Sequence, residues 1–258
     1  MIEHTDPVMA RLIGAEVERQ RSTLDLVASE NVTSTAVLEA LGSRLTDKYA
    51  EGFIGRRLYA GCAEVDRIEQ EAVARARELF RAEYANVQPH SGTQANQMVY
   101  HAVLKHGDTI LSMATEQGGH YSHGYPTSAP GSSYRIVSYG VDPSTHRLDM
   151  EALATLAKRC QPKLIIAGAS SYPRQLDYEG FARIARDVGA FLHVDMAHIA
   201  GLVAARCHGS DPARGLHHVH VPEDHARTAR RVLLARARMP RRSTRRASPV
   251  RREVRSCT

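Results

Sequence analysis

Three short apolar runs, separated by helical patterns, constrain the fold of this chain more than any other feature of its sequence. The runs cover residues 109–113, 163–168 and 190–195, a length typical of buried strands. Apolar residues recur at helical spacing in 149–159 and 178–188, before and after the second run. Strands that alternate with helices favour a mainly parallel sheet covered by helices on both faces. The sequence therefore predicts an α/β fold.

Two more helices are expected before the first of these strands. Residues 66–84 carry apolar side chains at helical spacing with charges between them, and a second helical pattern runs to Leu104. Ser91-Gly92-Thr93 stands at the start of this second helix. The free N–H groups at a helix N-terminus and the positive end of its dipole favour a bound phosphate. Ser and Thr are also common helix caps, so an ordinary cap is the alternative.

A carboxylate, Asp195, ends the third apolar run. Ligands in open α/β sheets bind at the carboxyl ends of strands, which makes Asp195 a candidate ligand-binding residue. A carboxylate in that place needs a cationic or N–H partner, because burial otherwise raises its pKa. The alternative is that Asp195 caps the following helix. His198 would lie on the same face if that segment is helical.

The glycine-rich segment 118–124 contains two histidines, His120 and His123. Glycines allow the backbone to approach a ligand closely, and an imidazole can stack on a flat ring. The alternative is that both histidines are simply solvated in a loop. No cysteine or carboxylate stands at a supporting spacing, so no metal site is predicted.

The net charge of +6 is unevenly distributed along the 258 residues. Residues 1–205 have a net charge of −4, whereas 206–258 hold 14 Arg against four acidic residues, a net charge of +10. The second segment has no Lys, Phe, Tyr or Trp, and we expect it to be mostly disordered. Taken alone, its arginines suggest a nucleic-acid partner.

The remaining composition indicates a soluble protein of a reducing compartment. The four cysteines are scattered without a C-x-x-C pair, so neither a zinc site nor a disulfide framework is indicated. The N-terminus carries acidic side chains where a signal peptide would be basic and then apolar. No apolar run approaches the length needed to span a membrane. We expect a cytoplasmic location and no membrane partner.

Five long motifs carry a resemblance to a known enzyme family over residues 10–205. They read LVASEN at 26–31, KYAEG at 48–52, NVQPHSG at 86–92, YGVD at 139–142 and VDMAHIAGLVAA at 194–205. The chain resembles serine hydroxymethyltransferases, which are pyridoxal-phosphate enzymes of the aspartate aminotransferase fold, fold type I. The resemblance implies a homodimer that interconverts serine and glycine, with tetrahydrofolate as the one-carbon carrier.

The resemblance divides the chain into three segments. Residues 1–60 are expected to form an N-terminal arm with dimer contacts, and 61–205 an incomplete large cofactor-binding domain with a mainly parallel sheet. The arginine-rich residues 206–258 are expected to form a separate tail.

The resemblance also implies roles for individual residues. Asp195 would hold the pyridine nitrogen of the cofactor, while His120 stacks on the ring. Ser170 and His198 would flank the phenolic oxygen of the ring. The phosphate would be bound at Ser91, Gly92 and Thr93. The implied catalytic residues are Glu51, His120, Asp195 and His198.

Substrate and folate positions are implied in the same way. The substrate-binding residues would be Ser29, Tyr49, Glu51 and Tyr59. The last three would reach the active site of the neighbouring subunit, where Glu51 is a candidate for proton transfer to the substrate hydroxymethyl group. The folate-binding residues would be Thr115, Gly119, His120 and Tyr121.

Three positions depart from the family's pattern. Thr115 and Tyr121 stand where the family usually has leucines that line the folate pocket, and Thr93 replaces a common serine but keeps the hydroxyl. Because the folate pocket differs, an α-methylserine hydroxymethyltransferase or a related aldolase is an alternative.

The chain lacks the Schiff-base lysine that this family links to its cofactor. All of its lysines precede Asp195: Lys48, Lys105, Lys158 and Lys163. The family's lysine position falls at Glu223-Asp224. If codons beyond Ala213 are read one nucleotide later, they permit Lys-Thr-Met-Arg-Gly-Pro-Arg-Gly-Gly at this place. This overlap predicts a frameshift between about Ala205 and Ala213.

The frameshift would make 206–258 an out-of-frame tail, which removes most of the support for a nucleic-acid partner. Without the lysine, the chain as printed is expected to be inactive. A non-enzymatic function is also an open alternative. The chain would then be a non-catalytic protein that pairs with an intact subunit or binds nucleic acid through its tail.

Overall fold

A computed structural model describes residues 2–27 and 29–205 of the chain. The disorder and the out-of-frame origin predicted for 206–258 lie outside these described residues. Within the described part, every helix is too short or too polar to span a bilayer.

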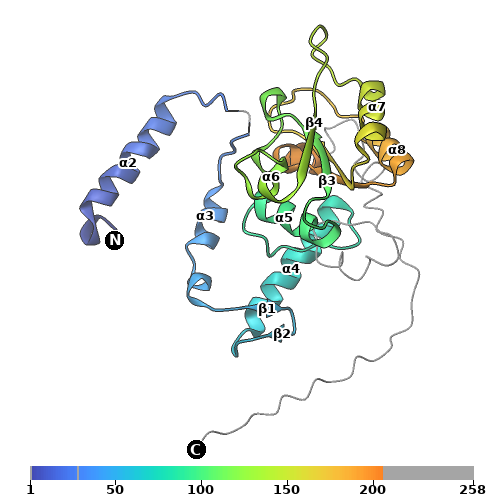
Figure 1. The fold of residues 1–258 in the computed structure, drawn as a ribbon. Helices are drawn as coiled ribbons and strands as arrows, with labels where there is room; N and C mark the ends of the chain where they lie inside the picture. Colours follow the sequence, from blue (N-terminus) through green and yellow to red (C-terminus); the bar gives the residue numbers. More distant parts are fainter. Residues whose placement is uncertain (1, 28, 206–258) are drawn as a thin grey trace, which may run out of the picture.

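The first part of the chain extends away from the rest of the protein. Its elements are α1 (Ile2–Thr5), α2 (Pro7–Ser22), α3 (Thr35–Leu41), the 3-10 turn η1 (Arg44–Asp47) and a hairpin of β1 (Gly52–Phe53) and β2 (Arg56–Arg57). No residue of α1, α2 or α3 is buried, and Figure 1 shows α2 and α3 standing apart from the sheet. The dimer contacts expected of residues 1–60 stay a prediction.

Local sequence explains where the longest helix of this arm begins. The Asp6 carboxylate accepts a hydrogen bond from the Met9 N–H at 3.0 Å, and Pro7 occupies the first helical position. An aspartate cap satisfies one of the N–H groups that the first turn leaves free, and proline is pre-organised for that turn. Because α2 buries no residue, local signals of this kind define it rather than packing.

The core of the described chain is a parallel sheet of four strands. They are β3 (Thr109–Met113), β4 (Arg135–Tyr139), β5 (Leu164–Gly168) and β6 (Phe191–Asp195), in the order β4-β3-β5-β6. The parallel sheet and three of its strands confirm the prediction from the apolar runs. The prediction missed β4, because Arg135 and Ser138 interrupt its apolar residues and the strand lies at an edge of the sheet.

Helices and short turns precede, connect and follow these strands. The helices are α4 (Ala63–Phe80), α5 (Gly92–Val103), α6 (Ala129–Ser133), α7 (Met150–Cys160), α8 (Tyr178–Val188) and α9 (Ala200–Ala204). The 3-10 turns are η2 (Thr115–Gln117), η3 (Tyr121–His123) and η4 (Ala197–Ile199). The helix predicted over 66–84 ends earlier, at Phe80, because Arg81 adopts a left-handed conformation with φ of 52°.

The two faces of the sheet are covered by different helices, as predicted for this fold class (Figure 1). One set of strand residues packs on Val99 and Tyr100 of α5: Ile110, Leu164, Ile166 and Phe191. Their neighbours in sequence pack on the other face with Leu153 of α7 and Phe181 of α8: Leu111, Ile165, Ala167 and Leu192. Because side chains alternate along a strand, Asp195 follows Phe191 onto the face of α5.

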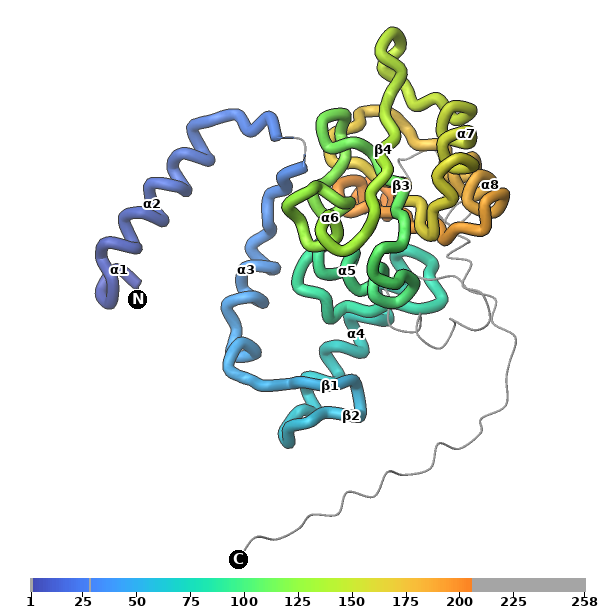
Figure 2. The backbone as a smooth tube through the Cα atoms, viewed as in Figure 1, coloured from blue at the N-terminus to red at the C-terminus, as the bar shows by residue number. Residues whose placement is uncertain are grey.

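The connection from β4 to α7 projects beyond the rest of the described chain, as Figure 2 shows. Val141 and Leu148 pair at its base as an antiparallel bridge. The hydroxyl of Ser144 and the N–H of Thr145 donate to Asp142 at 2.6 and 2.8 Å, and these bonds lower the pKa of Asp142 to about 2. Asp142 of the YGVD motif thus organises a turn.

Candidate active site

The pairing of β5 with β6 brings Asp195 to the carboxyl edge of the sheet, opposite Gly168. A Cβ atom on Gly168 would lie 2.8 Å from the Cβ of Asp195, so this position requires glycine. The side chain of Asp195 is 14% exposed. The carboxylate is therefore held at a defined place, mostly out of water.

Three hydrogen-bond donors from three segments surround this carboxylate. His123 Nε2 lies 2.8 Å and Asn96 Nδ2 lies 2.9 Å from Asp195 Oδ2. The Ala197 N–H donates to Asp195 Oδ1 at 3.0 Å. This is the bond expected if Asp195 caps the helical segment that follows it, which was the alternative interpretation of this residue. Asp195 therefore both caps the turn after β6 and binds side chains from α5 and η3.

These donors decide the charge of Asp195. Burial by itself would raise the pKa of this carboxyl. The hydrogen bond from His123, the proximity of His123 and His193, and the hydrogen bond from Asn96 outweigh burial and hold the pKa of Asp195 well below its usual range. The partners that the sequence analysis required for a buried carboxylate are present, and Asp195 is ionised.

His120 lies at the edge of the same cluster. Its ring centroid is 5.8 Å from that of His198 and 5.6 Å from that of His123. Its Nδ1 atom is 2.7 Å from the hydroxyl of Ser122. Burial, and then the proximity of His123, lower the pKa of His120, although Asp195 opposes this shift. His120 is thus a neutral ring beside an ionised carboxylate network.

A second histidine of the network is fixed by Asn96. His193 Nε2 lies 2.8 Å from Asn96 Oδ1, on the face of the sheet that α5 covers. Burial lowers the pKa of His193 to about 4, and His123 adds to this effect while Asp195 opposes it. His193 is therefore neutral and donates its Nε2 proton to Asn96.

The N-terminus of α5 lies next to the turn that follows Asp195. The Ser91 hydroxyl accepts the Gln94 N–H at 3.1 Å, so Ser91 is the helix cap that the sequence analysis gave as the alternative. A Cβ atom on Gly92 would lie 3.9 Å from the Cβ of Ala197. The first turn of the helix, with Gly92 and Thr93 exposed, is thus placed beside the carboxylate cluster, and its phosphate role stays a prediction.

The loop after β5 presents a serine without a partner. The Ser170 N–H donates to the Gly118 carbonyl at 2.7 Å, which ties this loop to the glycine-rich segment. The Ser170 hydroxyl oxygen is buried and has no hydrogen-bond partner among the described residues. A buried hydroxyl without a partner is uncommon and indicates a place for a bound group.

The positions implied for folate surround the same glycine-rich segment. Gly119 allows close packing, because a Cβ atom there would overlap the carbonyl oxygen of Met113. Tyr121 is 51% exposed and stacks on Tyr125 with ring centroids 4.2 Å apart, while Thr115 lies half-buried in η2. The tyrosine in the leucine position thus presents a polar aromatic ring at the surface.

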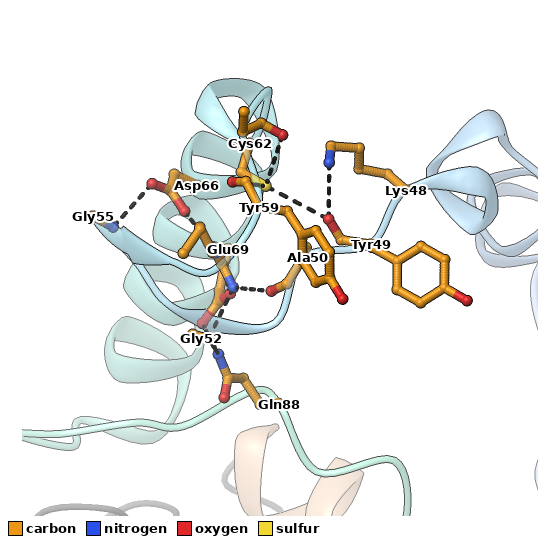
Figure 3. A network of polar contacts seen from close by, with 12 residues as sticks. Lys48, Tyr49, Ala50, Gly52, Gly55, Tyr59, Cys62, Asp66, Glu69 and Gln88 are labelled. Carbon is orange, nitrogen blue, oxygen red and sulfur yellow. Dashed lines mark hydrogen bonds and ion pairs between the residues drawn. The ribbon is translucent and has the colours of Figure 1, made fainter. Parts of the chain in front are cut away.

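The residues implied for the substrate lie in a separate part of the described chain, and Figure 3 shows Tyr49 and Tyr59 among them. Tyr49, Glu51 and Tyr59 flank the β1–β2 hairpin, and the rings of Tyr49 and Tyr59 are 5.5 Å apart. Ser29 is exposed between α2 and α3. Among the described residues, no hydrogen bond, ion pair or ring contact joins these four to the cluster around Asp195.

A buried arginine holds this hairpin in shape. Arg57 donates to the Asp66 carboxylate at 2.7 Å, to the Ala50 carbonyl at 2.8 Å and to Glu69 (Figure 3). Its side chain is only 6% exposed. Gln88 joins Glu69 at 3.0 Å, which connects the hairpin to the segment before α5. No pattern in the sequence predicted this network.

The structure also reveals site residues that the sequence analysis missed. They are Asn96, Ser122 and His193. His123 is 2% exposed, so the alternative that both loop histidines are solvated is wrong for it. The alternation along β6 was a usable signal for His193, because Phe191 already fixes which side chains face α5. Within 2–27 and 29–205, no three His, Cys, Asp or Glu side chains are grouped to hold a metal ion.

Comparison with known proteins identifies the family. A sequence model of the family described as serine hydroxymethyltransferase matches residues 2–237. The serine hydroxymethyltransferase of Coprothermobacter proteolyticus is 57% identical over 209 residues, which cover 81% of this chain and 50% of that protein. Serine hydroxymethyltransferase 1 of Rhodospirillum rubrum is 58% identical over 199 residues, or 77% of this chain and 46% of that protein.

The chain spans about half the length of the curated relatives it matches. The family match includes residues 206–237, within the range for which the sequence analysis predicts an altered reading frame, and the frameshift stays a prediction. The α/β fold with its parallel sheet is the one expected from the resemblance, fold type I of the pyridoxal-phosphate enzymes. With the matched relatives and the family model in agreement, the chain belongs to the serine hydroxymethyltransferase family.

Proposed function

We propose that the full enzyme to which this chain corresponds transfers the hydroxymethyl carbon of serine to tetrahydrofolate and forms glycine. The main support is the ionised carboxylate of Asp195, held by His123 and Asn96 at the carboxyl end of β6. A permanent negative charge at this edge of an α/β sheet suits a ligand that carries a protonated ring nitrogen.

The described residues fit pyridoxal phosphate. Asp195 would pair with the pyridine nitrogen, His120 would lie against the ring, and the partnerless Ser170 hydroxyl would bond to the phenolic oxygen beside His198. Ser91, Gly92 and Thr93 would bind the phosphate at the N-terminus of α5. When bound, the cofactor supplies an electron sink for the bond that breaks at the substrate α-carbon.

A second subunit would complete the site. Tyr49, Glu51 and Tyr59 stand on the hairpin that Arg57 organises, and none of them reaches Asp195 of its own chain through a described contact. In a homodimer the hairpin would enter the partner's site, where Glu51 would move a proton at the substrate hydroxyl. Ser29 would bind the amino-acid substrate.

The residues at the positions implied for tetrahydrofolate match the family's pattern only in part. Gly119 and His120 match the positions implied for tetrahydrofolate, whereas Thr115 and Tyr121 replace leucines. The exposed ring of Tyr121, stacked on Tyr125, changes the shape and polarity of this surface. For this reason an α-methylserine hydroxymethyltransferase or a related aldolase remains the second candidate.

The printed chain would lack turnover, because no lysine follows Lys163. A lysine amine is the nucleophile that holds pyridoxal phosphate covalently in enzymes of this kind. We expect the 258-residue chain to bind the cofactor only non-covalently. Borohydride treatment of the chain with pyridoxal phosphate should leave no specific adduct on its lysines: Lys48, Lys105, Lys158 and Lys163. A stoichiometric adduct on one of them would contradict the proposal.

Restoring the reading frame tests the activity itself. Nucleotide sequencing across codons 200–215 and a one-nucleotide correction should give a longer protein with a lysine at the family position. That protein should release glycine from serine only when both pyridoxal phosphate and tetrahydrofolate are present. Activity on α-methylserine but not on serine would favour the second candidate. A corrected frame without the Lys-Thr sequence would refute the frameshift.

A further inference from the structure

A chain of hydrogen bonds joins Asp195 to His120 through two buried residues, Asn96 and Ser122. The Nδ2 atom of Asn96 lies 2.9 Å from Asp195 Oδ2 and 2.9 Å from the Ser122 hydroxyl. An ionised carboxylate only accepts hydrogen bonds, so the amide must turn its NH₂ group toward Asp195. The Oδ1 atom of Asn96 then faces His193 Nε2 at 2.8 Å, which makes His193 Nε2 the donor of that bond.

The orientation of Asn96 fixes the direction of the next bond. The Ser122 oxygen already accepts one proton from Asn96, and its own single proton is free to point at His120 Nδ1, 2.7 Å away. The Ser122 N–H also donates to His120 Nδ1 at 3.1 Å. Tyr100 holds this turn in place through its hydroxyl, which donates to the Ser122 carbonyl at 2.9 Å.

Two donors on Nδ1 leave no room for a proton on that nitrogen. A neutral imidazole with a bare Nδ1 must carry its proton on Nε2. We infer that Asn96 and Ser122 are positioning residues that hold His120 as the neutral Nε2–H tautomer, with the charge of Asp195 setting the direction of the chain. This inference deepens the proposed function and rests on it, because it concerns the ring that would stack on the cofactor.

The tautomer has a consequence for cofactor binding. A cofactor whose pyridine nitrogen is protonated against Asp195 carries positive charge in its ring, and a charged imidazolium above it would repel it. A neutral His120 avoids this repulsion. The groups that face His120 are His123 at 5.6 Å, His198 at 5.8 Å and the Asp195 carboxylate. His123 and burial favour the neutral ring, whereas Asp195 alone would favour the charged one.

The tautomer can be measured on the full 258-residue chain without cofactor. Long-range ¹H–¹⁵N spectra of ¹⁵N-histidine protein distinguish a bare nitrogen from a protonated one, and a His120→Gln sample assigns the signals of His120. The expected pattern at neutral pH is a bare Nδ1 and a protonated Nε2. A proton on Nδ1, or a charged ring at that pH, would overturn the inference.

Ser122→Ala tests the hydroxyl. It removes one of the two donors to Nδ1, so the proton affinity of His120 should rise about fivefold, the effect of one ordinary hydrogen bond. Ser132→Ala is the matched control, because the Ser132 hydroxyl bonds the Ala129 carbonyl at 3.0 Å, outside this cluster. An unchanged titration of His120 in Ser122→Ala would show that the hydroxyl does not position the ring.

Asn96→Ala tests the earlier link. Without the amide, the Ser122 proton can turn away, and the spectrum of His120 should show a mixture of tautomers. Asn96 would have no positioning role if Ser122→Ala shifts the titration of His120 while Asn96→Ala changes neither its tautomer nor its titration.

Pyridoxal phosphate added to the same sample separates the two proposals. A ring stacked on His120 should displace the carbon-bound proton signals of that imidazole. Absence of any displacement, with the expected tautomer present, would count against the proposed cofactor and leave the tautomer standing. A displacement together with a protonated Nδ1 would support the cofactor and refute the role given to Asn96 and Ser122.

Discussion

His123 Nε2 lies 2.8 Å from the Oδ2 atom of Asp195, although the two residues are 72 positions apart in the sequence. The His120 N–H points at His123 Nδ1 from 3.4 Å, so Nδ1 is the acceptor nitrogen and Nε2 carries the proton. His123 therefore donates to the carboxylate from a buried position. This bond keeps Asp195 ionised despite its burial, and it links the glycine-rich segment to the end of β6.

Replacing His123 should weaken cofactor binding. In His123→Leu, Asp195 loses its strongest donor, its pKa rises, and the carboxylate holds a protonated ring nitrogen less well. Hydrogen bonds to charged groups contribute about 1.5–3 kcal/mol, so the dissociation constant of pyridoxal phosphate should increase about tenfold to a hundredfold. Equilibrium dialysis of the full chain measures this, with His123→Gln as the control that keeps an N–H donor. Equal affinities for the two variants would contradict the role of the bond.

The stability of the chain should fall in two acid steps. Folding lowers the pKa of His193 from 6.5 to about 4, so the folded protein keeps it neutral while the unfolded chain binds a proton. The stability from this group is complete above pH 6.5 and is lost as the pH falls toward about 4. A shift of this size corresponds to at most about 3 kcal/mol. The pKa of Asp195 is also lowered, and its contribution is lost only below the ordinary aspartate range.

His193→Gln separates these steps. The variant keeps an N–H donor for Asn96 but cannot titrate, so the loss of stability between pH 6.5 and about 4 should become smaller while the loss at lower pH persists. Denaturant unfolding at a series of pH values measures both. His101→Gln, an exposed position on α5, should leave the profile unchanged. A wild-type slope in His193→Gln would assign the first step to another group.

The sequence could predict the sheet but not the donors of Asp195. Apolar runs flanked by helical patterns identify buried strands by local periodicity, which is why β3, β5 and β6 were expected and the interrupted edge strand β4 was not. His123 has no periodic signal. Its burial depends on how segment 118–124 folds over α5, a contact between distant parts of the chain.

The same limit applies to Asn96 and Arg57. Asn96 is 4% exposed on the apolar face of α5, and its partner Asp195 is 99 residues away. A polar residue on such a face signals a buried network, but not which residue it meets. Arginine is usually found at the surface, so the sequence gives no sign that Arg57 is buried. Its role becomes visible only in its ion pairs with Asp66 and Glu69 on α4.

Gly168→Ala should disturb the position of Asp195. The new Cβ would overlap backbone and side-chain atoms of Asp195, so β5 and β6 must separate locally. Overpacking of this kind costs about 1–3 kcal/mol and should also weaken cofactor binding. Denaturant unfolding and equilibrium dialysis measure the two effects. Gly201→Ala, with no atom within 4 Å of the new Cβ, should be neutral or stabilise α9 by about 1 kcal/mol. Equal behaviour of the two variants would refute the steric argument.

Arg57→Lys should loosen the hairpin that carries Tyr49, Glu51 and Tyr59. Lysine keeps the positive charge but cannot bond Asp66, Glu69 and the Ala50 carbonyl at once. Disrupting a buried ion pair costs on the order of 3 kcal/mol, so the hairpin should open about a hundredfold more often. Limited chymotrypsin digestion reads this out as faster cleavage at aromatic residues of the segment.

Arg44→Lys is the matched control for this experiment. Arg44 pairs with Asp47 on η1, but its side chain is 98% exposed and that of Asp47 63% exposed, so the pair contributes little. Chymotrypsin should cleave Arg44→Lys and the unmodified chain at the same rate, and Arg57→Lys faster at Tyr49, Phe53 and Tyr59. Faster cleavage in both variants would mean that any loss of arginine loosens the arm. Unchanged cleavage in Arg57→Lys would show that packing of α4, rather than the arginine network, holds the hairpin.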